Sequence, residues 1–182
     1  TKNSFLKVKN VSLNETRRGF LLILEKMGAE IYYENISVSS GESYGDIIVK
    51  SSELKNIDIP GEIIPNIIDE IPILSVAGLF AKGTFKIRNA SELRKKESDR
   101  INSLCTNYKQ SGLSVEEYDD GFSVSGKIKT KEVIFDSFHD HRIAMAFSIL
   151  AFLLKEGGKV DNFSCVNISN PDFMNQVKQI AG

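Results

Sequence analysis

Apolar residues recur with two periods at the start of the chain, and these periods predict a strand, a helix and two further strands. Phe5 to Val11 alternates apolar and basic residues as a strand does, whereas Arg17 to Met27 spaces its apolar residues along one helical face. Gly28 is expected to end this helix, because glycine readily takes the left-handed conformation found at helix ends. Glu30 to Ser39 and Asp46 to Ser51 are then predicted to be strands.

The same order recurs, so the sequence contains an internal repeat. Gly83 to Ala90 is predicted to be a strand, Ser98 to Gln110 a helix that ends near Gly112, and residues 114–124 a hairpin. A third, partial copy runs from Lys159 to Ile180. With the helix that precedes each later copy, the predicted repeating unit is β-α-β-α-β-β.

These preceding helices are predicted at Asp69 to Gly83 and at Asp140 to Leu154. Aspartate is a preferred N-cap residue, so Asp69 and Asp140 are expected to cap them. Both helices are apolar on nearly every side, which indicates burial. The predicted fold class is therefore α/β (α+β), inside-out and barrel-like, with repeated β-α-β-α-β-β units, buried helices and outer sheets. We expect residues 1–182 to form a single domain, with truncation at both ends left open.

Composition limits the partners of the chain. Lys and Arg number 23 against 24 Asp and Glu, so the net charge of -1 gives no general attraction for nucleic acid or a membrane surface. The sequence has no apolar run near the roughly 20 residues that span a bilayer. Cys105 and Cys165 lack the Cys/His spacing of a zinc site, so reduced thiols and a cytoplasmic location are expected, with no metal. Any anion binding must therefore be local.

A charged run, Arg94 to Arg100, lies between a predicted strand and a predicted helix. Its cations and the unpaired N–H groups of the helix could converge on one anion, although such a run is also typical of a solvated surface. In a helix that starts near Lys96, Lys96 and Arg100 would share one face, and Glu97 could pair with Arg100. Glu97 is then either structural or a proton-transfer group, and the residues alone favour neither.

The other candidate cluster, His139-Asp-His-Arg142, contains both histidines of the chain. Too few further ligands are near for a metal site, and a solvated turn is one alternative. The other is that the guanidinium of Arg142 binds a carboxylate or phosphate while His141 assists proton transfer. The repeat also puts Asp69 at the position that Asp140 occupies in this cluster.

Three segments carry a resemblance to a known family: Asp69-Glu-Ile-Pro72, Leu93 to Ile101 and Asp140 to Ala146. Together they resemble the 5-enolpyruvylshikimate-3-phosphate synthases. The resemblance implies a transferase that moves the enolpyruvyl group of phosphoenolpyruvate to the 5-hydroxyl of shikimate 3-phosphate and releases phosphate, in the shikimate pathway of aromatic amino-acid biosynthesis. It implies no cofactor and a cleft between two similar domains, of which this chain would be most of one. A monomer that binds neither nucleic acid nor membrane is expected.

The resemblance also implies roles for individual residues. Asp69 would bind the shikimate hydroxyl and act as base, and Lys96 would bind shikimate 3-phosphate. Glu97 would contact phosphoenolpyruvate and transfer a proton to its methylene carbon. Arg100 and Arg142 would bind phosphoenolpyruvate.

Other positions match the family less completely. His141 belongs to the motif and is expected in the catalytic set, whereas His139 has no implied role and Glu92 stands where some members carry Asn. Ile168 stands where some members carry Lys, which affects one expected phosphoenolpyruvate contact and sensitivity to the inhibitor glyphosate. The motifs of the second domain are absent from this sequence, so the chain alone is expected to be inactive.

Two other functions compete with this interpretation. UDP-N-acetylglucosamine 1-carboxyvinyltransferase shares the fold and the donor, but the Lys-Glu-Ser-Asp-Arg and Asp-His-Arg-Ile-Ala-Met runs fit the shikimate enzyme better. A non-catalytic anion-binding module would explain the basic run, but the net charge of -1 and the lack of interleaved aromatic residues disfavour a nucleic-acid ligand.

Overall fold

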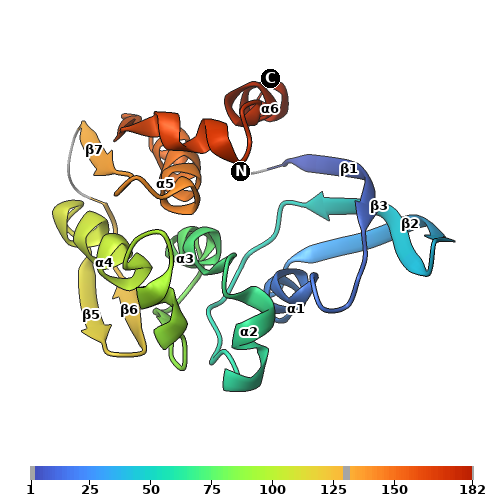
Figure 1. Cartoon of the computed structure of the whole chain (residues 1–182), viewed down its shortest axis with the longest axis horizontal. Coiled ribbons are helices and arrows are strands. Elements are labelled where there is room, and N and C mark those ends of the chain that lie inside the picture. The colour runs from blue at the N-terminus through green and yellow to red at the C-terminus, as the bar shows by residue number, and fades with distance from the viewer. Residues whose placement is uncertain (1–2, 129–131, 182) are drawn as a thin grey trace.

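The computed structural model describes residues 3–128 and 132–181. Its first unit consists of β1 (Phe5–Ser12), α1 (Gly19–Lys26), β2 (Glu30–Ser39) and β3 (Glu42–Lys50). The sheet order is β1-β3-β2, and both pairs are antiparallel. Strands β1 and β2 therefore run parallel to each other on either side of β3, and α1 connects them (Figure 1).

The second unit has the same topology. It comprises β4 (Phe85–Ile87), α4 (Arg100–Gln110), β5 (Ser114–Tyr118) and β6 (Gly121–Ser125), and its sheet order is β4-β6-β5. A 3-10 helix, η2 (Ser91–Lys95), precedes α4. Because the second strand of the hairpin is central in both sheets, the structure confirms the internal repeat expected from the sequence.

Two apolar helices connect successive units. Helix α5 (His141–Leu153) joins the parallel strands β7 (Val133–Asp136) and β8 (Gly158–Asp161), and β7 was not expected from the sequence. Helix α3 (Ile71–Phe80) is flanked in the same way by Lys55 and Lys82, which form a parallel bridge. The connections on either side of the two helices therefore match.

The remaining elements are short. The segment from 57 to 68 contains η1 (Gly61–Ile63) and α2 (Ile64–Ile67). After β8 come η3 (Phe163–Ile168) and α6 (Phe173–Ala181). Among the described residues no single helix is long and apolar enough to cross a membrane, and only the bent pair formed by η1–α2 and α3 meets the length and composition requirement.

The expected burial of the helices and outer position of the sheets are confirmed. Helices α3 and α5 pack against each other, and Ile71, Leu74, Phe147 and Leu150 are at most 2% exposed. Gly78 allows close packing of α3 on β4, because a Cβ at that position would lie 2.4 Å from Cδ2 of Phe85. In the described part of the chain the strands form three separate small sheets and do not join into one closed barrel (Figure 1).

Candidate active site

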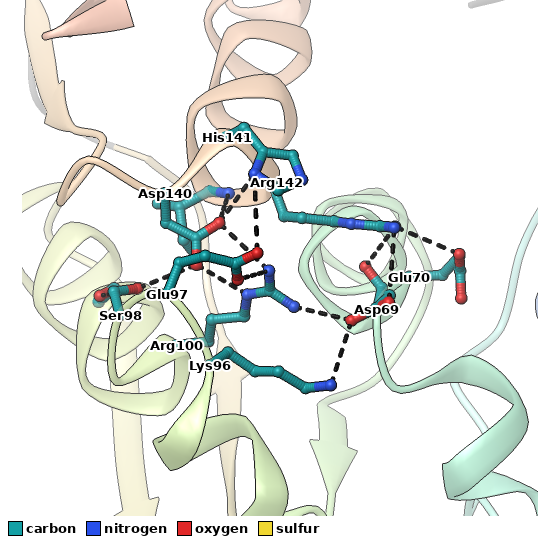
Figure 2. A network of polar contacts seen from close by, with 11 residues as sticks. Asp69, Glu70, Lys96, Glu97, Ser98, Arg100, Asp140, His141 and Arg142 are labelled. Atoms are coloured by element: carbon teal, nitrogen blue, oxygen red, sulfur yellow. Dashed lines mark hydrogen bonds and ion pairs between the residues drawn. The ribbon is translucent and has the colours of Figure 1, made fainter. Parts of the chain in front are cut away.

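The buried guanidinium of Arg100 is the centre of the candidate site. Arg100 is the first residue of α4, and its side chain is only 1% exposed. Its Nε donates to Asp140 at 2.8 Å, one terminal nitrogen donates to Asp69 at 2.9 Å, and the other donates to Glu97. Burial disfavours the cation, but the facing carboxylates outweigh this effect and raise the pKa of Arg100. Arg100 thus joins residues from three parts of the sequence (Figure 2).

Asp140 is the carboxylate most completely enclosed in this cluster. It is 0% exposed, and it caps α5 by accepting from the backbone N–H groups of Arg142 at 2.8 Å and Ile143 at 3.4 Å. The Ser98 hydroxyl donates to it at 3.2 Å. Burial works against ionisation, yet Arg100 and the backbone donors lower the pKa of Asp140 overall. The expected cap of α5 is confirmed, and the same carboxylate also fixes Arg100.

Asp69 does not cap α3, so that expectation was wrong. Glu70 takes the N-cap position, and no side chain in the described ranges caps this helix. Pro72 weakens such a cap: at the matching position Asp140 accepts from two backbone N–H groups, whereas a capping Asp69 would have only that of Ile71, because the next residue is proline. The carboxylate of Asp69 instead faces the cations of the cluster.

Three cations surround the carboxylate of Asp69. Arg100 donates to it, Lys96 Nζ lies 3.6 Å away, and Arg142 lies 3.5 Å away (Figure 2). Burial raises the pKa of Asp69, but Arg142, Arg100 and Lys96 together outweigh burial and lower it. Asp69 is therefore ionised at neutral pH, with a side chain 34% exposed and accessible to a ligand.

Helix α4 begins later than the sequence indicated. It starts at Arg100 with Asp99 as its N-cap, so Lys96 and Glu97 lie before the helix and the predicted one-face spacing of Lys96 and Arg100 was wrong. The two cations still approach the same carboxylate, because the extended backbone at Lys96 directs its chain toward Asp69. The predicted pairing of Glu97 with Arg100 is confirmed.

Glu97 and His141 lie on the more exposed side of the cluster. The side chain of Glu97 is 49% exposed, and its second oxygen is 3.9 Å from Nδ1 of His141. Helix α5 begins at His141, directly after its capping residue. An exposed carboxylate next to an imidazole is an arrangement suited to proton transfer.

A tight turn leads into α5 and sets the position of Asp140. Phe138 and His139 have φ values of 51° and 55°, in the left-handed region that is unfavourable for side chains of this size. Asn107, which is buried on α4, donates to the carbonyl of Asp136 and accepts from its N–H, both at 2.9 Å. The Asp136 carboxylate and the Ser137 hydroxyl in turn accept the N–H groups of Phe138 and His139. These bonds hold an otherwise strained backbone in place.

The structure does not bring every charged residue of the two motifs into the cluster. Arg94 donates to Asp99, to Glu117 and to backbone carbonyls of the β5–β6 hairpin. Glu92 and Lys95 line a separate hollow beside Asn89. His139 is exposed, and Ile168 is 90% exposed at the end of η3.

Two residues of the cluster were not identified from the sequence. Glu70 lies 3.3 Å from a terminal nitrogen of Arg142, and Ser98 bonds to Asp140. Both are adjacent in sequence to an identified residue, but their partners could not be assigned without the fold. No group of three or more potential metal ligands occurs in residues 3–128 and 132–181.

The fold is a repeat-built α/β arrangement, and it brings carboxylates, two arginines and a lysine together close to the starts of α3, α4 and α5. Such a site can bind anions and exchange protons. A sequence model described as EPSP synthase (3-phosphoshikimate 1-carboxyvinyltransferase) matches residues 2–177. The chain belongs to the EPSP synthase family.

Individual relatives agree with the family model. The chain is 47% identical over 174 residues to the 3-phosphoshikimate 1-carboxyvinyltransferase of Petrotoga mobilis, covering 95% of this chain and 40% of the relative. It is 45% identical to that of Carboxydothermus hydrogenoformans, with 98% and 42% covered. A solved EPSP synthase structure from Acinetobacter baumannii matches with a TM-score of 0.87 and 33% identity, covering 99% of this chain and 42% of that one. The chain thus spans about two fifths of the length of these relatives.

Proposed function

We propose that this chain is one domain of a two-domain enzyme that transfers the enolpyruvyl group of phosphoenolpyruvate to the 5-hydroxyl of shikimate 3-phosphate and releases phosphate. Family membership supports the reaction, and coverage of about two fifths of each relative supports a further domain. The single observation that carries the assignment within the chain is the gathering of Asp69, Lys96, Glu97, Arg100 and Arg142 into one partly exposed cluster.

Asp69 is proposed as the base that takes the proton of the acceptor hydroxyl. With Arg142, Arg100 and Lys96 next to it, its pKa is lowered, and a carboxylate with a low pKa is a weak base. Anionic substrates that bind these cations would weaken their hold on Asp69. Its pKa would then rise when substrates are bound, which is when a base is required.

Lys96 and Arg142 are proposed as the cations that first meet the substrates, with Lys96 on shikimate 3-phosphate and Arg142 on phosphoenolpyruvate. Their side chains are 25% and 33% exposed, whereas that of Arg100 is 1% exposed. Arg100 could contact phosphoenolpyruvate only after Glu97 or Asp69 moves, because each of its nitrogens donates to a carboxylate here. We propose this movement as part of domain closure.

Glu97 is proposed to transfer the proton to the methylene carbon of phosphoenolpyruvate, with His141 beside it in the catalytic set. The exposure of Glu97 and its proximity to His141 support this role. A cytoplasmic monomer that needs no metal or other cofactor and binds neither nucleic acid nor membrane stays a prediction.

The test is phosphate release by the complete two-domain protein. We expect release that requires both phosphoenolpyruvate and shikimate 3-phosphate, and about 100-fold or greater loss of turnover in Glu97→Gln, which keeps the shape but removes the proton-transfer group. Arg142→Ala should mainly raise the KM for phosphoenolpyruvate. Release that depends on UDP-N-acetylglucosamine instead of shikimate 3-phosphate would contradict the proposed acceptor, and equal turnover in Glu97→Gln would leave that residue a structural role.

The chain without a second domain provides a further test. It carries only part of the proposed cleft, so we expect no phosphate release from it at any concentration of the two substrates. Measurable release by this chain alone would show that the cluster is a complete site.

A further inference from the structure

Glu70 has no role in the proposed reaction, yet its side chain contacts Arg142, which is proposed to bind phosphoenolpyruvate. One terminal nitrogen of Arg142 lies 3.3 Å from the Glu70 carboxylate and 3.2 Å from the Asp69 carbonyl oxygen (Figure 2). The other terminal nitrogen forms an ion pair with the Asp69 carboxylate. Residues 69 and 70 therefore face both terminal nitrogens of Arg142.

We propose that Glu70 is an affinity-determining residue that competes with the anionic group of the enolpyruvyl donor for Arg142. The inference rests on the proposed function and deepens it. A carboxylate or phosphate that binds Arg142 must replace the Glu70 carboxylate or share the guanidinium with it. In either case the negative charge of Glu70 opposes binding of an anion.

The two arginines of the cluster show why this competition centres on Arg142. Arg100 is almost fully buried, and its nitrogens donate to Asp69, Glu97 and Asp140. Arg142 is 33% exposed, and the Glu70 side chain that pairs with it is 30% exposed. A partly exposed pair exchanges partners more readily than a buried one, because water compensates for the lost contact.

The Glu70 side chain is not needed to start α3. Although Glu70 is the N-cap residue, its side chain forms no capping bond. The local backbone is held by Glu70 N–H donating to Ile67 O and Leu74 N–H donating to Glu70 O, both at 2.9 Å. Replacement of the carboxylate by an amide therefore changes the charge beside Arg142 without removing a helix contact.

The experiment measures phosphate release by the complete two-domain protein at varied phosphoenolpyruvate and saturating shikimate 3-phosphate. In Glu70→Gln we expect the KM for phosphoenolpyruvate to fall about two- to five-fold, the range for a partly exposed ion pair, with little change in kcat or in the KM for shikimate 3-phosphate. Glu70→Asp keeps the charge and should keep a KM near that of the wild type. The difference in the KM for phosphoenolpyruvate between the wild type and Glu70→Gln should shrink as the salt concentration rises.

Glu156→Gln is the matched control. Glu156 is exposed just beyond the end of α5, whereas Arg142 lies in its first turn, roughly 20 Å away by the helical rise. Glu156→Gln changes the net charge by the same amount as Glu70→Gln, and it should leave kcat and both KM values unchanged.

The outcomes separate the two proposals. Phosphate release by the wild type with an unchanged or raised phosphoenolpyruvate KM in Glu70→Gln would overturn competition by Glu70 and leave the proposed function intact. An equal fall in Glu156→Gln would also overturn it, because the effect would then be one of net charge. Absence of phosphate release by the wild type would overturn the proposed function. It would also overturn the competition of Glu70 with phosphoenolpyruvate, which rests on that function.

Discussion

The starts of α3 and α5 are equivalent positions in the repeat, yet their aspartates do different things. Both accept from Arg100, but Asp140 is 0% exposed and also accepts two backbone N–H groups of its helix, whereas the Asp69 side chain is 34% exposed and caps no helix. Pro72 contributes to the difference, since it removes one of the two N–H groups that a capping Asp69 could accept. One carboxylate is used by the fold, and the other stays available for a ligand.

The segments that lead into α3 and α5 differ as well. The chain reaches α5 through the left-handed residues Phe138 and His139, and Asn107 fixes the backbone just before them. The chain reaches α3 through the short helix α2 and a turn. The capped start is therefore rigidly tied to α4, while the uncapped start places a carboxylate among cations. This comparison teaches that the same residue at equivalent positions of a repeat can cap a helix in one copy and remain partly exposed in the other.

The largest expected effect on stability follows replacement of Asp140. Asp140→Asn should lower the free energy of unfolding by about 3–5 kcal/mol, because it leaves the buried Arg100 without its most enclosed counter-charge. Urea denaturation of the chain measures this. Asp58→Asn, at an exposed position, is the matched control and should change stability by less than about 0.5 kcal/mol. Equal values for the two variants would show that Arg100 does not depend on Asp140.

Low pH should reproduce part of this loss in the wild type. The pKa of Asp140 is lowered from its usual value of 3.8, so the folded state binds this proton less tightly than the unfolded chain does. Its contribution is fully present above about pH 4 and is lost as the pH falls through the lowered folded-state value. Denaturant titrations at several acidic pH values should give a steeper loss in the wild type than in Asp140→Asn. Parallel curves would contradict the assigned charge.

A smaller loss is expected from Asn107→Ala. Removal of the amide leaves the N–H and carbonyl of Asp136 without the two bonds that Asn107 makes, which should cost about 2 kcal/mol. Asn102→Ala, an exposed position on the same helix, is the matched control. If both variants unfold at the same urea concentration, the turn before Asp140 is held by its other bonds.

The sequence predicted the fold well, because periodicity reports burial directly. The strand-helix-strand-strand repeat and the burial of the two apolar helices were all visible in the pattern. Strand β7 was missed because it is only four residues long and follows a Lys-rich stretch of the sequence, so the alternation in Val133–Asp136 was too brief to recognise. Helix ends were less accurate, since the helix predicted from Ser98 begins at Arg100 with Asp99 as its cap.

The site was predicted only as far as local motifs allow. Asp69, Glu97, Arg100 and Arg142 were identified, but their pairing depends on the approach of three distant segments, which periodicity does not specify. Arg100 illustrates this limit: its basic side chain indicated a ligand for anions, whereas the fold surrounds it with carboxylates. Glu70 was missed because nothing in the sequence around it indicates that it faces Arg142.

The smallest expected effect on stability follows replacement of Asp69. Asp69→Asn should change the free energy of unfolding by less than about 1 kcal/mol, because its ion pairs are partly exposed and screened by solvent, and because no helix cap is lost. Urea denaturation of Asp69→Asn and Asp140→Asn in parallel measures the difference between their free energies of unfolding. In the complete two-domain protein, the same variant should lower turnover by about 100-fold or more, since the amide cannot accept the hydroxyl proton. A loss of stability as large as that of Asp140→Asn would mean that Asp69 is structural after all, because a carboxylate reserved for a ligand contributes little to the folded state.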